Sequence, residues 1–279
     1  MNLIQSVILA IVEGITEFLP ISSTGHMIIF SNIMGIQPTE YVKMFTIAIQ
    51  FGAILSVVAL YWKRFIQSFD FYIKLFIAFL PIGIIGFLFH KKIDALLENV
   101  TVVGITLLAG GVVFLFIDKW LSRDLPVTES KILDKPLDVT EKTPEELLDN
   151  AKALKIGFFQ AIAVIPGVSR SAATIIGGLT QNLSRKAAAE FSFLLAVPTM
   201  FVATLFKLYK YQKEVGFHKT DLSMLALGNA IAFLVAIFAI RFFIRFVTKH
   251  GFKVFGWYRI LVGGAILACY FLKVPLQIL

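Results

Sequence analysis

The residue types most able to do chemistry in this chain lie inside its most apolar stretches. Near the amino terminus these are Glu13, Glu17 and His26, and near residue 170 they are Ser169 and Arg170. A charged side chain within a membrane segment costs roughly 2.5 to 3.5 kcal/mol on insertion scales, so such residues mark candidate functional sites by default. We therefore expect catalysis or transport within a membrane.

Glu13 and Glu17 are four residues apart, so a helix places both carboxylates on one face. Two carboxylates in a low-dielectric site repel each other and persist only where one is protonated, a cation joins them, or a positive group is near. Such a pair can ligate a hard cation, and we expect Mg²⁺ or Ca²⁺ as a cofactor held by Glu13 and Glu17. The alternative is a pair of carboxylates hydrogen-bonded across helices for packing.

A hydroxyl and an imidazole follow this acidic pair. Ser23 lies three residues before His26, so one helical turn would bring the two side chains within reach. A hydroxyl beside a base is the minimum for an activated nucleophile, and Glu17 could orient or charge the imidazole. The alternative is a structural contact between the two. We expect the flanking hydroxyls of Ser22 and Thr24 to contact substrate.

The second polar cluster has the composition of a phosphate cradle. Ser169, Arg170 and Ser171 follow a Pro166-Gly167 pair, which would place backbone N–H groups, hydroxyls and a guanidinium at the start of a half-helix. Arginine suits this role because its planar fork holds two phosphate oxygens and keeps its charge when desolvated. The alternative for Arg170 is a structural cap on a neighbouring helix.

Two further residues are candidates for substrate binding. The hydroxyl of Thr174 follows the second cluster by one helical turn. Arg259 begins the last apolar stretch, where we expect it either to help bind phosphate or to anchor the helix at the membrane interface.

Composition predicts an integral membrane protein. Hydrophobic residues make up 58% of the 279 positions and charged residues 16%, against about 25% charged residues in soluble domains. The net charge of +8 does not indicate nucleic acid, because Lys and Arg cluster at the ends of apolar runs, where they meet lipid headgroups. The single cysteine, Cys269, excludes an intrachain disulfide framework. No basic leader precedes Lys43, so we expect the amino-terminal segment to be retained.

Six stretches approach the roughly 20 residues that cross a bilayer as a helix: 44–62, 71–90, 100–118, 187–208, 222–246 and 256–274. Two others, 3–33 and 155–182, are interrupted at Pro20 and at Pro166-Gly167. Each of these two resembles a pair of half-helices that could enter and leave a membrane by the same face. The predicted fold class is therefore an all-α polytopic membrane protein with six transmembrane helices and two re-entrant, broken-helix hairpins.

The two interrupted units read as copies, since each combines an apolar helix, a proline, a hydroxyl cluster and a small-residue helix. Each is followed by three spans, and because three is odd the second copy would be inverted. We predict one membrane domain, 1–279, made of a first repeat 1–118, a cytoplasmic connector 119–154 and a second repeat 155–279. The distribution of Lys and Arg puts the connector inside and both termini outside.

Four stretches of the sequence closely resemble one known family. Residues 13–26 read EGITEFLPISSTGH and residues 166–171 read PGVSRS, which resemble the two signature stretches of the bacterial undecaprenyl-diphosphate phosphatases of the BacA/UppP type. FSFLLAVP at 191–198 and IQFGAIL at 49–55 are also similar to that family, and the resemblance runs from end to end. Ala172 stands where the family commonly has glycine after the second serine.

This resemblance implies an inner-membrane enzyme that removes the terminal phosphate of undecaprenyl diphosphate, with a site opening outward and a link to bacitracin resistance. It would regenerate the monophosphate carrier for cell-wall synthesis. The family's motif positions are occupied here by Glu13, Glu17, Ser23, His26, Ser169, Arg170, Ser171 and Thr174.

Two chemical routes remain open. In one, Ser23 attacks the terminal phosphorus with His26 as base; in the other, Glu17 or His26 activates a water molecule. The rival function is a polyprenyl-phosphate transporter or flippase, because secondary carriers also use inverted repeats with broken helices. A purely structural subunit would leave the buried charges unexplained. As partners we expect the polyprenyl diphosphate, membrane lipids and, as one assembly, a homodimer, but no nucleic acid.

Overall fold

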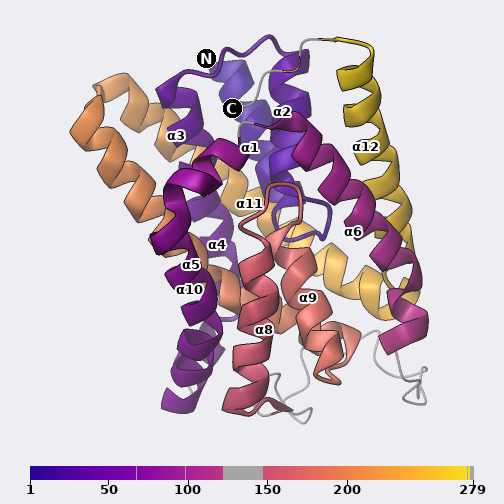
Figure 1. Ribbon diagram of the computed structural model, residues 1–279. Coiled ribbons are helices and arrows are strands. Elements are labelled where there is room, and N and C mark those ends of the chain that lie inside the picture. Colours follow the sequence, from indigo (N-terminus) through magenta and orange to yellow (C-terminus); the bar gives the residue numbers. More distant parts are fainter. Residues whose placement is uncertain (67, 98, 122–146, 275, 277–279) are drawn as a thin grey trace.

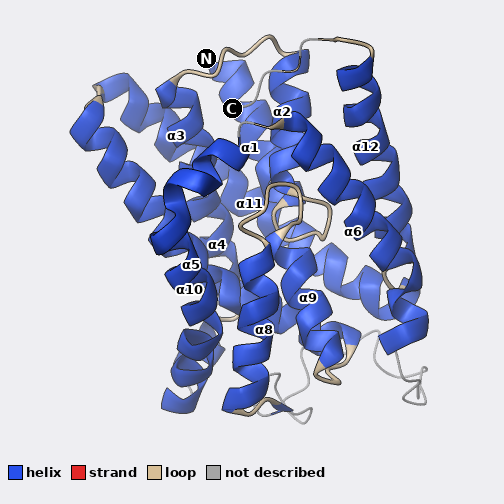
Figure 2. Cartoon of the chain, in the orientation of Figure 1, coloured by secondary structure: helices blue, strands red, loops and turns tan. Residues whose placement is uncertain are grey.

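Helices make up nearly all of the structure. The computed structural model describes the chain except for residues 67, 98, 122–146, 275 and 277–279. Within the described part there is no strand (Figure 2). The helices are α1 Leu3–Thr16, α2 Ser23–Ile33, α3 Glu40–Ala48, α4 Gln50–Leu60, the 3₁₀ helix η1 Trp62–Ile66, α5 Phe69–Leu97, α6 Val100–Leu121, α8 Asn150–Ile162, α9 Arg170–Thr180, α10 Arg185–Glu214, α11 Lys219–His250 and α12 Lys253–Phe271. The predicted all-α class is confirmed.

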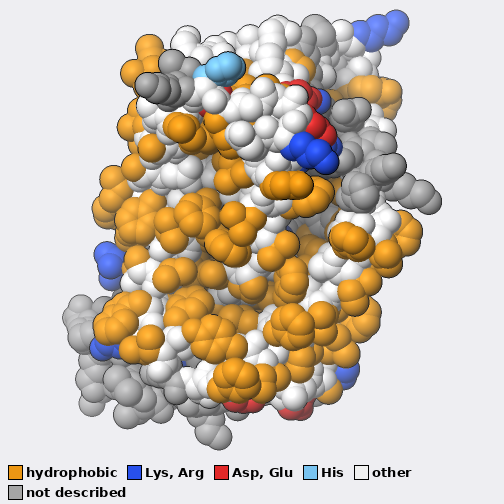
Figure 3. All heavy atoms as spheres, turned by 90° about the vertical axis from the view of Figure 1, so that its left-hand side faces the viewer, with side chains coloured by type: hydrophobic (Ala, Val, Ile, Leu, Met, Phe, Trp, Pro, Cys, Tyr) orange, Lys and Arg blue, Asp and Glu red, His pale blue; other side chains and the backbone are white. Residues whose placement is uncertain are grey.

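Six helical segments among the described residues are long and apolar enough to cross a membrane: Glu40–Leu60, Phe69–Phe89, Val100–Leu121, Arg185–Glu214, Asp221–His250 and Lys253–Phe271. They overlap the six predicted spans. On one face of the molecule a broad belt of hydrophobic side chains covers the middle, and most charged side chains lie toward the two ends (Figure 3). This is the surface of a multi-pass membrane protein.

The predicted span 44–62 corresponds to the membrane-spanning segment Glu40–Leu60, which is interrupted at one point. The segment consists of α3 and α4, which meet at Ile49. The side-chain oxygen of Asn229 on α11 accepts a hydrogen bond from the Gly52 amide at 2.6 Å. An uninterrupted helix would bond that amide to Ala48. A contact between distant parts of the sequence therefore competes with the helix at this point.

Both interrupted units form the predicted pairs of half-helices. α1 and α2 lead from the end of the molecule that holds the amino terminus to its middle and back, whereas α8 and α9 reach the middle from the opposite end (Figure 1). The two breaks, residues 17–22 and 163–169, lie between them. That these hairpins re-enter a bilayer stays a prediction.

Helices extend into both ends of the predicted connector 119–154. α6 runs on to Leu121, and α8 begins at Asn150 because the Asp149 side chain caps it. Residues 122–146 of the predicted connector lie outside the described residues.

Glycines allow the helices of the two halves to approach closely. A Cβ added to Gly263 of α12 would lie 2.8 Å from the Gly104 carbonyl oxygen of α6, and one on Gly111 would lie 2.9 Å from the Gly256 carbonyl oxygen. α1 packs on α11, and α8 packs on α5. Each interrupted unit thus packs against a long helix from the other half of the chain. The predicted inverted repeat would produce this reciprocal packing.

Candidate active site

The two breaks have the same local geometry. Ser22 (φ 68°, ψ 99°) caps α2, and its side-chain oxygen accepts a hydrogen bond from the Gly25 amide at 3.4 Å. Ser169 (φ 71°, ψ 117°) caps α9 and accepts one from the Ala172 amide at 3.2 Å. Positive φ costs a non-glycine residue roughly 1 to 3 kcal/mol, and such strain clusters at functional sites. Ser23 and Arg170 consequently occupy equivalent places, the first residue of each second half-helix.

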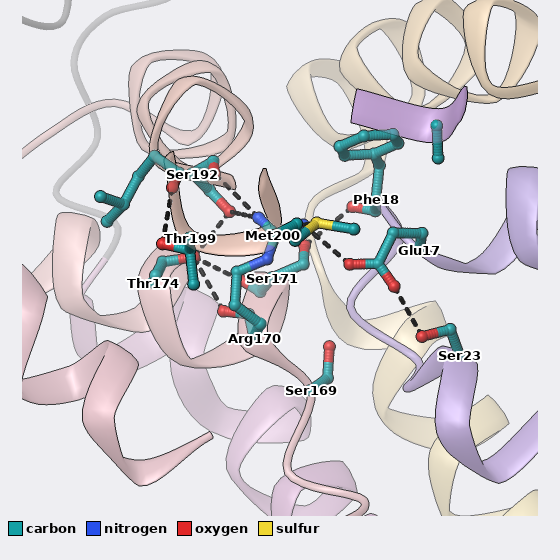
Figure 4. A network of polar contacts seen from close by, with 12 residues as sticks. Glu17, Phe18, Ser23, Ser169, Arg170, Ser171, Thr174, Ser192, Thr199 and Met200 are labelled. Carbon is teal, nitrogen blue, oxygen red and sulfur yellow. Dashed lines mark hydrogen bonds and ion pairs between the residues drawn. The ribbon is translucent and has the colours of Figure 1, made fainter. Parts of the chain in front are cut away.

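Glu17, at the carboxyl end of α1, joins the two breaks. Its Oε2 accepts a hydrogen bond of 2.6 Å from the Ser23 hydroxyl, and its Oε1 lies 3.0 Å from Nη2 of Arg170 in an ion pair (Figure 4). The side chains of Glu17 and Arg170 are only 8% and 10% exposed, so solvent screens this pair weakly. Glu17 of the first polar cluster and Arg170 of the second are therefore in direct contact.

Other protein groups satisfy only some of the remaining N–H donors of the Arg170 guanidinium. Nη1 donates to the Ser192 carbonyl oxygen at 2.9 Å, and the Phe18 ring centroid lies 5.8 Å from the guanidinium carbon. Nε is buried and has no hydrogen-bond partner within the described part of the chain. Buried polar groups normally have a partner, so this N–H is a donor that the described protein groups leave unsatisfied. Ser192 was missed by sequence reasoning, although it lies within the quoted FSFLLAVP stretch.

Glu13 is an acceptor without a protein donor. It lies on α1 one turn before Glu17, is 1% exposed, and neither carboxylate oxygen has a hydrogen-bond partner among the described residues. A buried carboxylate in this state is costly unless it takes a proton or a cation. No group of three or more His, Cys, Asp or Glu side chains suited to a metal occurs in the described ranges. The two carboxylates and the Ser23 hydroxyl nevertheless supply the oxygen donors that a hard cation prefers.

The expected pairing of Ser23 with His26 is wrong, because Ser23 donates to Glu17 instead. The His26 ring has Nδ1 at 2.8 Å from the Ser22 carbonyl oxygen and Nε2 at 2.7 Å from the Tyr258 hydroxyl. A carbonyl can only accept, so Nδ1 carries the proton and the Tyr258 hydroxyl donates to Nε2 in the neutral ring. The two rings also stack, with centroids 5.5 Å apart. Sequence reasoning missed Tyr258, which lies 232 positions away from His26.

Most of the predicted substrate-binding hydroxyls are engaged by the protein. Ser171 donates to the Phe18 carbonyl oxygen at 2.8 Å, a bond from the second break to the first. Thr174 contacts the Ser192 hydroxyl at 2.6 Å and the Arg170 carbonyl at 2.9 Å. Both hydroxyl side chains are buried; Ser171 joins the second half-helix to the first break, whereas Thr174 joins α9 to α10. Of the remaining candidates, Ser22 and Ser169 cap helices and Thr24 is partly exposed.

Arg259 is not an interfacial anchor, because it is 0% exposed. Its guanidinium donates to the carbonyl oxygens of Pro20 (3.0 Å), Gly167 (3.1 Å), Thr106 (3.1 Å) and Leu107 (3.4 Å). The expectation that Arg259 binds phosphate finds no support in these contacts, since all four acceptors are backbone groups.

Fold and site together define a class: a multi-pass helical membrane protein in which two interrupted hairpins join carboxylates, a serine and an arginine in a buried polar site at its centre. Residues 6–265 match the family described as Bacitracin resistance protein BacA, and the chain belongs to that family. The predicted resemblance is therefore confirmed.

Several relatives of the chain carry the name undecaprenyl-diphosphatase. That of Flavobacterium psychrophilum is 52% identical over 281 residues, covering 100% of both chains. That of Bdellovibrio bacteriovorus is 50% identical over 267 residues, covering 96% of this chain and 95% of its own. The Aquifex aeolicus protein is 45% identical over 269 residues, covering 96% and 98%. The similarity thus spans the whole molecule.

Proposed function

We propose that this chain is an undecaprenyl-diphosphatase that hydrolyses undecaprenyl diphosphate to undecaprenyl phosphate and inorganic phosphate. The product is the lipid carrier reused in cell-wall synthesis, and its supply would underlie bacitracin resistance. The names of the full-length relatives and the family match support this activity. The observation that carries it is the Glu17 carboxylate, which accepts hydrogen bonds from a serine of one half and an arginine of the other.

The geometry supports serine as the nucleophile and Glu17 as its base. The Ser23 oxygen attacks the terminal phosphorus as its proton passes to Glu17 Oε2. The bond to the bridging oxygen breaks, and Glu17 passes that proton to the departing undecaprenyl phosphate, which leaves the carboxylate able to act as a base again. Water then gives a proton to Glu17 and attacks the phosphoserine; the Ser23 oxygen leaves and takes this proton back, and inorganic phosphate is released. His26 acts on these steps by fixing the Ser22 carbonyl, which belongs to the peptide that precedes Ser23. This replaces His26 as the expected base.

Arg170 and α9 supply the positive side of the site. The free Nε–H of Arg170 and the amides at the start of α9 would bind the phosphate oxygens, since helix amino-terminal ends attract anions. A donor placed where charge develops stabilises the transition state most.

Glu13 and Glu17 would hold a divalent cation, Mg²⁺ or Ca²⁺, whose charge would offset that of the diphosphate when it is bound. The unpartnered Glu13 oxygens support this assignment. Ligands beyond the two carboxylates would come from the substrate and water.

A furrow beside the site suits the polyprenyl tail. It has a volume of about 320 Å³, lies between the end of α1 and α11, and is lined by Ile15, Leu19, Val235, Phe238, Ala239 and Phe242. Ile15 and Leu19 lie two positions to either side of Glu17 in the sequence, so the furrow runs along the segment that carries the carboxylate. We assign the first isoprene units of the substrate to this furrow.

We place the enzyme in the bacterial inner membrane with both termini and the site opening toward the outer face. The support is the excess of Lys and Arg predicted for the opposite side. The homodimer expected from the sequence stays a prediction.

The test is phosphate release from undecaprenyl diphosphate by purified protein in detergent, without vesicles. A transporter or flippase has nothing to move in that sample, so an absence of release would contradict the phosphatase. Acid quenching during a single turnover, followed by mass spectrometry, should find phosphate on Ser23. Turnover without that adduct would favour direct attack by water activated by Glu17.

A further inference from the structure

Arg259 contacts three segments that are far apart in the sequence. Pro20 belongs to the first break, Gly167 to the second, and Thr106 and Leu107 to α6. Pro20 precedes the cap Ser22 by two residues, and Gly167 precedes the cap Ser169 by two residues. One guanidinium therefore bonds the equivalent carbonyl groups of both breaks.

These carbonyl groups need a donor for a physical reason. Backbone in a break loses the hydrogen bonds of a continuous helix, and at membrane depth water is not there to replace them. Arginine offers five N–H donors in a rigid plane and stays charged when buried, so one side chain can satisfy several carbonyls pointing toward one place. All four acceptors are neutral oxygens, and the guanidinium is fully buried. Its contacts are those of a structural clamp.

The carbonyl groups that Arg259 binds lie a few residues before the proposed reacting residues. Ser23 lies three residues after Pro20 and Arg170 three residues after Gly167, so the two carbonyls held by Arg259 set the starting points of α2 and α9. Glu17 can contact both Ser23 and Arg170 only if the first residues of α2 and α9 are correctly placed relative to each other. An error of about 1 Å in such an alignment costs roughly 100-fold in rate.

We propose that Arg259 is a positioning residue, which joins the two breaks through their carbonyls and thereby aligns Ser23 with Arg170. This inference rests on the proposed phosphatase activity. It assigns Arg259 a role in the rate of phosphoryl transfer, not in binding the phosphate.

The structure offers a way to disturb the clamp without changing any clamp or site residue. Gly110 of α6 faces the guanidinium, and a Cβ added there would lie 2.2 Å from Arg259 Nη2 and 2.8 Å from Cζ. The variant Gly110→Ala should therefore displace the guanidinium. Gly264→Ala is the matched control, because a Cβ at Gly264 of α12 would meet nothing within 4 Å.

The experiment compares Arg259→Lys, Gly110→Ala, their combination and Gly264→Ala in detergent. Each single disruptive variant should lower kcat by roughly 10- to 100-fold with KM within about threefold, since alignment matters chiefly in the transition state. The double variant should lose little more than the worse single variant, because both act on one contact. Gly264→Ala should match the wild type.

Hydrogen exchange provides a readout independent of turnover. Peptides covering the first and the second break should both exchange faster in Arg259→Lys and in Gly110→Ala, and neither in Gly264→Ala. The proposed role of Arg259 would be contradicted by a normal kcat in Gly110→Ala or by losses that multiply in the double variant. It would also be contradicted by a raised KM with unchanged kcat, or by faster exchange in only one of the two breaks. An inactive wild type would instead refute the phosphatase, so the two failures are distinguishable.

Discussion

At the scale of residues, the site depends on one carboxylate with two partners. Glu17 accepts a hydrogen bond from the Ser23 hydroxyl on one oxygen and one from the Arg170 guanidinium on the other. The same carboxylate therefore contacts the proposed nucleophile of one half and the cation of the other. The ion pair holds the oxygen that faces Ser23 in place and also joins the two halves of the chain.

Glu17→Gln should lower kcat by a factor on the order of 10³, because the amide is a poor base and leaves Arg170 without its counter-charge. Steady-state phosphate release would measure the effect. Ser23→Ala should cost a similar factor, and the combination little more than either change, since residues acting as a unit are not additive. Independent, multiplying losses would show that Ser23 and Glu17 do not act in one step.

Glu13→Gln tests the cation. If Glu13 and Glu17 hold Mg²⁺ or Ca²⁺, the variant should need roughly tenfold or more of the cation for half-maximal rate, because it loses one charged ligand. EDTA should abolish wild-type activity, and added Mg²⁺ or Ca²⁺ should restore it. Full activity of the wild type after exhaustive chelation would contradict a metal at this place.

Sequence reasoning identified these side chains but not all of their contacts. Glu17 and Arg170 were predictable because charged residues in apolar stretches are conspicuous. The serine's partner was not predictable: Ser23 and His26 lie one turn apart on α2, but the break at 17–22 folds the chain back so that Ser23 faces Glu17. Tyr258 was also not predictable, because the contact joins positions 232 residues apart and only the fold brings them together.

At the scale of elements, the two breaks were the most predictable feature of the fold. Proline and glycine act locally, so their position in an apolar stretch predicts where a helix ends. The positive φ angles of Ser22 and Ser169 were not predictable, because serine seldom adopts them without support from its surroundings. The division between α3 and α4 was missed for the same reason: its cause, Asn229, lies on another helix.

Phe238→Ala tests the furrow between α1 and α11. Phe238 is 70% exposed and forms part of its wall, so removing the ring should weaken contact with the tail and raise KM for undecaprenyl diphosphate about three- to tenfold. Phe206→Ala is the control, because Phe206 is 57% exposed on α10 and lies outside the furrow. Equal effects of both substitutions, or of neither, would place the tail elsewhere.

At the scale of the whole molecule, the site exists only where the two halves meet. Ser171 and Arg170 of the second half bond to Phe18 and Glu17 of the first. α6 and α12 hold the halves together on one side, with glycines at the crossing points. In a membrane, where helix association gains little from the hydrophobic effect, such close backbone contact is a main source of affinity between helices.

Gly263→Val should separate α6 from α12 and disturb both stability and catalysis. A Cβ at Gly263 would lie 2.8 Å from the Gly104 carbonyl oxygen and 2.9 Å from Leu107 Cβ, and overpacking of this kind costs roughly 1 to 3 kcal/mol. Leu107 also supplies one of the carbonyls that Arg259 binds, so the strain reaches the breaks. Gly264→Val is the control on the adjacent residue: it gains the same helix propensity, but its Cβ meets no atom within 4 Å. Thermal unfolding in detergent and phosphate release should therefore fall together in Gly263→Val alone. A stable Gly263→Val protein with normal turnover would mean that the site tolerates movement of the two halves, contrary to an active site built at their junction.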